Sequence, residues 1–172
     1  MKPVDFEMTT LLDTTSAIAA LTLSDNDTKI IAGGQSLGPM LNLRLARPNA
    51  LVEIAKIPEL REITQTEDYV AFGAATRHAE IEDGMTPDPS RGLMPFVAAG
   101  IAYRAIRNKG TVGGSLCHAD PAADWVTAMT ALNATLVIKS GRGGTKTTPM
   151  MGFILGAYRT ILEPDEILTS VR

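Results

Sequence analysis

The sequence predicts an α+β fold, in which a small α/β lobe of about residues 1–56 precedes a mainly antiparallel lobe of about residues 57–172. In the first lobe, short apolar strands alternate with helical segments, which is typical of a parallel sheet. After Pro58 the apolar residues instead alternate around turn-forming residues, which is typical of antiparallel hairpins. No repeat, low-complexity segment or flexible linker separates the two lobes.

Two helices are expected in the first lobe. Asp13 and Thr14 offer an N-cap, and apolar residues follow at helical spacing as far as Leu21. A second, short helix is expected near Pro39, because the first helical turn does not need the N–H that proline lacks, and Pro48 ends it. The strands expected beside these helices are residues 29–32 and 50–54.

Hairpins and helices are both expected in the second lobe. Turn residues at 66–68 and 140–143 separate apolar segments, which predicts two hairpins. Thr76 is expected to cap a helix through Glu82, and a single helix is expected over residues 93–106 despite Gly100. The remaining elements expected are a helix from Pro121 to about Leu132 and strands at 60–63, 69–72, 135–139, 144–148 and 166–171.

Composition excludes several classes of function. The chain has 172 residues, 45% of them hydrophobic, and a net charge of −3, so it lacks the basic excess that a nucleic-acid surface needs. Its single cysteine, Cys117, cannot form an internal disulfide or supply the ligands of an iron–sulfur cluster. No stretch approaches the ~18 apolar residues of a membrane span, and Asp5 and Glu7 lie where a signal peptide would be apolar. We therefore expect a cytoplasmic protein.

Two segments carry paired glycines at the end of a strand or in a tight loop. The first glycine segment is residues 30–39, and the second glycine segment is residues 108–116. Glycine lets backbone N–H groups approach an anion closely, so two such segments could hold the two phosphates of a dinucleotide. Neutral side-chain donors are available at Gln35, Ser36, Thr111 and Ser115.

Taken singly, each glycine pair also fits a simple turn between elements. The familiar phosphate-binding motifs do not match. The first glycine segment has the spacing Gly-Gly-x-x-x-Gly at Gly33, Gly34 and Gly38, which differs from G-x-G-x-x-G, and no Gly-Lys-Ser/Thr follows either pair. No nucleophile or set of metal ligands is apparent elsewhere, so no catalytic residue is assigned.

A resemblance decides between these interpretations. Three motifs, at residues 32–44, 107–124 and 156–168, closely resemble the FAD-binding, medium subunit of the xanthine dehydrogenase and carbon monoxide dehydrogenase family. The resemblance runs from about Pro3 to the C-terminus. Members of this family normally continue into a small C-terminal domain, and this chain stops about where that domain begins.

The resemblance implies the fold of the vanillyl-alcohol oxidase and p-cresol methylhydroxylase type, with FAD extended between the lobes. It further implies an electron relay: a molybdopterin-containing large subunit acts on the substrate, a small subunit with 2Fe-2S clusters carries electrons to FAD, and NAD, oxygen or a quinone receives them. By motif position, the implied FAD contacts are Ile30, Ile31, Ala32, Gly33, Gly34, Gln35, Ser36, Leu37, Ile101, Thr111, Val112, Gly113, Gly114, Ser115, Asp124 and Leu168.

Two other functions stay open. One is a stand-alone flavoenzyme of the same fold, for which His118 and Tyr158 are the only candidate acid–base residues. The other is a cofactor-free module that assembles subunits. A colourless protein that cannot take up FAD would favour the second.

Several other polar or reactive residues have simple structural interpretations. His78 is expected on the surface, Cys117 as a small buried hydrophobe, and Trp125 in the core. Asp120 and Asp124 could form a carboxylate pair, but helix capping ahead of Pro121 explains Asp120 more simply.

Overall fold

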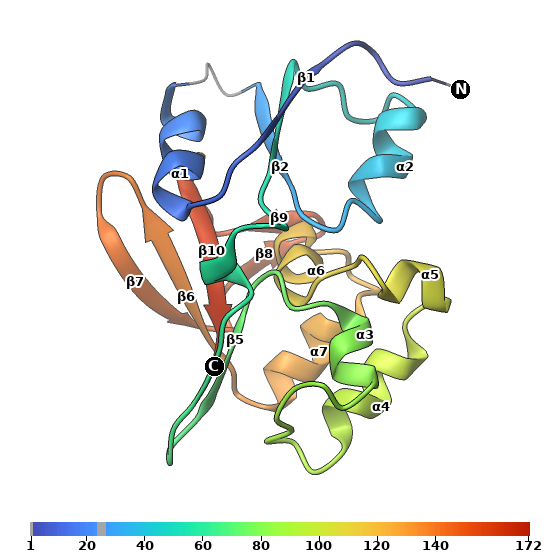
Figure 1. Cartoon of the computed structure of the whole chain (residues 1–172), viewed down its shortest axis with the longest axis vertical. Helices are drawn as coiled ribbons and strands as arrows, with labels where there is room; N and C mark the ends of the chain where they lie inside the picture. Colours follow the sequence, from blue (N-terminus) through green and yellow to red (C-terminus); the bar gives the residue numbers. More distant parts are fainter. Residues whose placement is uncertain (1, 24–26) are drawn as a thin grey trace.

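A small parallel sheet forms the N-terminal part of the protein. The computed structural model describes residues 2–23 and 27–172. Strands β1 (Glu7–Thr10), β2 (Thr28–Ile31) and β3 (Ala50–Glu53) pair in parallel in the order β1-β3-β2. Helices α1 (Thr14–Leu23) and α2 (Leu37–Asn42) connect the strands and lie on either side of them (Figure 1). The expected alternation of strands and helices is therefore present.

A five-stranded antiparallel sheet forms the larger part, with the strand order β4-β5-β10-β6-β7. The hairpins predicted at the two turns are confirmed, and the C-terminal strand lies between them. Outside this sheet, two short strands form a hairpin that the sequence pattern did not predict. The strands are β4 (Ile63–Gln65), β5 (Val70–Gly73), β6 (Thr135–Ser140), β7 (Gly144–Pro149), β8 (Ile154–Gly156), β9 (Arg159–Thr160) and β10 (Glu166–Val171).

Short helices cover the antiparallel sheet. They are the 3₁₀ helix η1 (Pro58–Leu60) and the α-helices α3 (His78–Glu82), α4 (Leu93–Gly100), α5 (Arg104–Arg107), α6 (Val112–His118) and α7 (Asp124–Ala131). None of the helices in the described part of the chain is long and apolar enough to span a membrane.

Three helix predictions were wrong in detail. The single helix expected over residues 93–106 breaks after Gly100, because Ala102 takes a left-handed conformation and an extended Tyr103 precedes the next helix. Thr76 does not cap α3, which starts one residue later with Arg77 at the N-cap position. Helix α2 ends at Asn42, before the Pro48 that was expected to end it.

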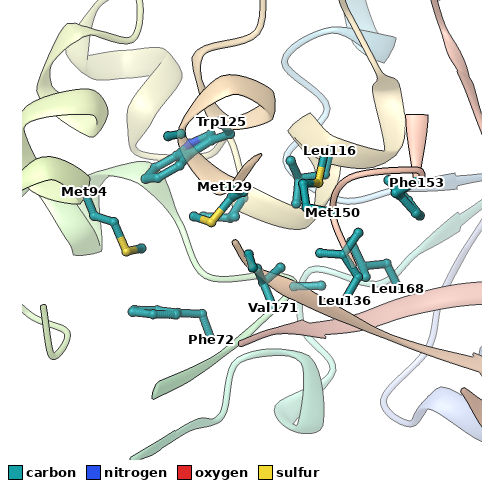
Figure 2. Packing of buried hydrophobic residues seen from close by; sticks show 14 of the residues in the cluster. Phe72, Met94, Leu116, Trp125, Met129, Leu136, Met150, Phe153, Leu168 and Val171 are labelled. Carbon is teal, nitrogen blue, oxygen red and sulfur yellow. The ribbon is translucent and has the colours of Figure 1, made fainter. Parts of the chain in front are cut away.

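The main core lies between the antiparallel sheet and helices α4, α6 and α7, as Figure 2 shows for Phe72, Trp125, Met129 and Leu136. Burial of each large apolar side chain of this kind contributes roughly 1.5–3 kcal/mol. A second cluster joins α1 and β3 to η1 and β10, with Ile167 of β10 among its members. This second cluster fixes the parallel sheet against the antiparallel one and so positions the surfaces that face each other between them.

Candidate dinucleotide-binding cleft

The first glycine segment follows the carboxyl end of β2 and leads into α2. Gly34 has φ +69°, a left-handed conformation that a residue with a Cβ rarely adopts. The Gln35 side chain donates from Nε2 to the Gly33 carbonyl at 2.6 Å, and the Gly38 N–H donates to the Gly34 carbonyl at 2.8 Å. These two bonds stabilise the conformation of the loop.

A run of backbone donors in this loop lacks acceptors. Within the described residues, the N–H groups of Gly33, Gly34, Gln35, Ser36 and Leu37 donate no hydrogen bond. Successive free N–H groups at the start of a helix form a concave anion site, since both the donors and the helix dipole favour negative charge. The loop can therefore hold a phosphate group through the main chain.

The second glycine segment is built differently from the expected loop. Thr111 caps α6, accepting a hydrogen bond on Oγ1 from the Gly114 N–H at 3.1 Å. The N–H groups of Val112 and Gly113 donate to the carbonyls of Thr76 and Ala74 at 3.0 and 2.9 Å. Because these amides already have acceptors, this segment offers a ligand its surface and side chains rather than a row of free N–H groups.

Packing brings the two glycine segments into direct contact. A Cβ on Gly33 would lie 2.1 Å from the Lys109 carbonyl oxygen and 2.8 Å from the Gly110 Cα, so only glycine permits this approach. A Cβ on Gly114 would lie 3.7 Å from the Ala32 Cβ. The two segments, far apart along the chain, thus meet at one place.

A cleft of about 660 Å³ opens where the segments meet. Its size lies within the roughly 300–1,000 Å³ of ligand pockets. Val112 is the exception among the expected contacts: it is fully buried in the main core and does not line the cleft. The expected contacts that line it are Ile30, Ile31, Ala32, Gly33, Gly34, Gln35, Ser36, Leu37, Ile101, Thr111, Gly113, Gly114, Ser115, Asp124 and Leu168.

The C-terminus of α6 and the turn between β8 and β9 form a corner that lines the cleft. His118 and Tyr158 line it, with their ring centroids 5.2 Å apart. The Tyr158 N–H donates to the Ala119 carbonyl at 2.8 Å, and both residues have left-handed backbones, with φ of 58° and 53°. Such backbone strain persists only where the surrounding contacts enforce it, so this corner is held firmly.

Asp120 lies beside this corner and lines the cleft, but it does not cap a helix as expected. Its Oδ1 accepts from the Ala122 N–H at 2.9 Å, which closes a local turn. Helix α7 starts only at Asp124, with Ala123 in the N-cap position. The two carboxylates therefore belong to different local structures.

His78 contradicts the expectation of a surface residue, because it is only 5% exposed. The Trp125 indole donates from Nε1 to His78 Nδ1 at 3.0 Å. Burial, with a smaller contribution from the charge of Arg107, lowers the pKa of His78 to about 4. The imidazole is therefore neutral near pH 7, and since Nδ1 accepts, its proton is on Nε2.

The other two residues given a structural interpretation from the sequence are Trp125 and Cys117. Trp125 is fully buried in the main core, as expected. Cys117 is half-buried against the cleft, and burial raises the pKa of its thiol to about 12. At neutral pH Cys117 is thus a protonated, weakly reactive group.

An α+β fold with a loop of free N–H groups, a second glycine segment against it and a cleft lined by both segments defines a nucleotide-cofactor-binding domain. The chain belongs to the family described as the FAD binding domain in molybdopterin dehydrogenase, whose model matches residues 5–172. Both the family and the fold predicted from the three motifs are confirmed.

Sequence comparison finds relatives that are named as subunits of dehydrogenases. The chain is 37% identical to the 6-hydroxypseudooxynicotine dehydrogenase complex subunit alpha of Paenarthrobacter nicotinovorans, over 99% of the chain and 57% of that protein. It is 36% identical to the carbon monoxide dehydrogenase medium chain of Hydrogenophaga pseudoflava, over 100% of the chain and 60% of that protein. The chain therefore spans 57–60% of the length of these relatives.

Two solved structures match the fold of this chain closely. Carbon monoxide dehydrogenase from Hydrogenophaga pseudoflava matches with a TM-score of 0.92 and 36% identity, covering 99% of this chain and 59% of that chain. Quinoline 2-oxidoreductase from Pseudomonas putida 86 matches with a TM-score of 0.90 and 36% identity, over the same shares.

Proposed function

We propose that the two lobes, about residues 1–56 and 57–172, hold FAD between them in the cleft and that the protein acts as the flavoprotein part of a molybdenum hydroxylase. In this proposal it receives electrons from 2Fe-2S clusters of a small subunit, while a molybdopterin-containing large subunit acts on the substrate. NAD, oxygen or a quinone is the acceptor, and the complex is cytoplasmic. The single observation that carries the proposal is the meeting of the two glycine segments at one cleft.

The residues around the cleft fit a dinucleotide. The free N–H groups of residues 33–37 suit a diphosphate, because they neutralise charge without side-chain cations. Asp124 can accept a hydrogen bond from a ligand hydroxyl group, and Ile101 and Leu168 offer apolar surface for a ring system. Ser115 adds a neutral hydroxyl beside the second glycine segment.

When bound, FAD supplies the redox chemistry, and the protein supplies position and electrostatics. The loop of residues 33–37 orients the diphosphate, and the hydrogen bond from the Tyr158 N–H to the Ala119 carbonyl fixes the turn that carries Tyr158 at the cleft. No side chain here needs to act as a nucleophile for this role. The names of the relatives, a subunit of a dehydrogenase complex and a medium chain, support a place in a larger assembly.

Loading with FAD tests the proposal, with two matched substitutions. Gly114→Leu places a side chain at the cleft surface, where even a Cβ would lie 2.7 Å from Thr111 Oγ1. Gly38→Leu is the control, because no atom lies within 4 Å of the position of a Cβ on Gly38. We expect the wild-type protein and the Gly38→Leu variant to bind FAD and turn yellow, and the Gly114→Leu variant to stay folded by circular dichroism but colourless. Normal loading of Gly114→Leu would show that the ligand lies elsewhere.

Two alternatives predict different results. A cofactor-free assembly module predicts that the wild-type protein takes up no FAD at any concentration. A stand-alone flavoenzyme is favoured by the His118–Tyr158 pair in the cleft, and it predicts that His118→Gln and Tyr158→Phe abolish reduction of bound FAD by a small substrate. The relay predicts instead that both variants still accept electrons from the iron–sulfur subunit.

A further inference from the structure

His78 stands at the junction between the second glycine segment and the core. Its backbone N–H donates to the Gly110 carbonyl at 3.0 Å, and a Cβ on Gly110 would lie 2.6 Å from His78 Nε2. The neighbouring Arg77 forms a β-bridge with Thr111. The imidazole therefore packs directly against the peptide that leads into Thr111 and α6.

The orientation of the imidazole is fixed from its other side. Trp125 is fully buried, and its indole N–H can only donate, so Nδ1 must be the unprotonated nitrogen. The proton of the neutral ring is consequently on Nε2, the atom nearest to Gly110.

That Nε2–H has no acceptor among the described residues, although the ring lines the cleft. Thr76 Oγ1 is the one fully buried side-chain nitrogen or oxygen without a partner in the part of the chain that the structure describes. His78 Nε2 also lacks a hydrogen-bond partner, but it is not among the fully buried atoms without one. It therefore keeps some accessible surface. It is a fixed, neutral donor next to Gly110, on a side chain that lines the cleft beside the second glycine segment.

We propose that His78 is a further ligand of the bound dinucleotide, donating its Nε2–H to a phosphate oxygen beside Thr111. This proposal rests on the proposed function and adds to it. The second glycine segment has few free amides of its own, so a side-chain donor here complements the row of backbone donors in the first segment. A neutral donor is well suited to the site, because it binds the anion without the cost of burying a cation.

The test compares His78→Phe with His78→Gln. Phenylalanine keeps a planar ring but removes the donor, whereas the glutamine amide can place an N–H near the position of Nε2. Affinities for FAD, ADP and riboflavin are measured by calorimetry and flavin fluorescence, and folding by thermal denaturation. We expect His78→Phe to bind FAD and ADP about 10- to 100-fold more weakly, as for a lost hydrogen bond to a charged group, with riboflavin affinity unchanged. His78→Gln should recover most of the lost affinity.

Three results of this test would overturn the proposal that His78 binds the dinucleotide. If both variants bind FAD as tightly as the wild-type protein, His78 is not a ligand. If both lose affinity for all three compounds equally and unfold at lower temperature, His78 only supports the fold and the proposal is overturned. If the wild-type protein itself binds neither FAD nor ADP, the proposed function fails, and this inference fails with it.

Discussion

Acid should destabilise this protein through one buried imidazole before its carboxylates titrate. The pKa of His78 falls from 6.5 to about 4 on folding, mainly because of burial, so between these pH values the unfolded chain binds a proton that the folded chain does not. Stability therefore rises with pH across this window, and it is lost as the pH falls from 6.5 toward 4. At pH 5 the loss relative to pH 7.5 amounts to about 2 kcal/mol, or roughly 4–8 °C in melting temperature for a domain of this size.

Thermal and urea denaturation at pH 7.5, 6.5, 5.5 and 5 measure this loss, with His78→Gln as the matched control. This variant has no titrating group at position 78, so its stability should change little over the range. Hydrogen bonds from Thr10 and Arg107 lower the pKa of Glu53 and of Glu82, respectively, so these groups affect stability only below about pH 4.5. An equally steep fall in His78→Gln would refute the assignment of the effect to His78.

Three further predictions have defined outcomes. Gly33→Ala places a Cβ 2.1 Å from the Lys109 carbonyl oxygen and should lower the free energy of unfolding in urea by about 1–3 kcal/mol. Gly38→Ala has open space around its Cβ and should leave the free energy of unfolding unchanged, so equal effects of the two variants would refute the packing argument. Phe153→Ala removes a fully buried ring and should cost about 3–5 kcal/mol, a value below 1 kcal/mol being incompatible with its position in the core. Cys117, whose pKa is raised to about 12, should react with a thiol reagent at pH 8 at least about 100-fold more slowly in the native protein than in urea; comparable rates would contradict its burial.

The strands of the antiparallel sheet were accessible from sequence because they depend on local signals. Turn residues between alternating apolar segments predicted both hairpins of the antiparallel sheet. An apolar strand that ends in paired glycines predicted a turn after β2, and the structure has a loop there that leads into α2. In both cases the residues that carry the signal also form the turn.

Helix α6 could not be predicted because tertiary contacts form it. Paired glycines have low helix propensity, and Gly113 and Gly114 were therefore interpreted as a loop. In the structure Thr111 caps the helix, and the first amides donate to carbonyls of residues 74 and 76 rather than to neighbours in sequence. These distant acceptors fix the first turn and outweigh the propensity.

His78 was misplaced for a related reason. A histidine in the first turn of a short helix usually faces water, and nothing near it in sequence indicates otherwise. Its partner Trp125 lies 47 residues further along the chain. A lone buried tryptophan needs an acceptor for its N–H, and this requirement was the one available signal that a polar residue lies nearby in the core.

The glycines of the two segments are needed for two different physical reasons, close packing and a left-handed backbone. A sequence motif does not distinguish between these reasons. Gly33, Gly110 and Gly113 are small because protein atoms approach them: a Cβ on each would lie within 2.1–2.6 Å of Lys109, His78 and Ala74, respectively. Gly34, in contrast, is needed for its left-handed backbone.

Gly114 lies at the cleft surface, where a Cβ would meet only the Thr111 hydroxyl and, at 3.7 Å, the Ala32 Cβ. Substitutions at the closely packed glycines should therefore lower stability and FAD affinity together. Those at Gly114 should lower affinity with a smaller loss of stability, because the added Cβ displaces only the Thr111 hydroxyl that caps α6. A motif of this kind is consequently stronger evidence for the arrangement of the backbone than for any single contact with the cofactor.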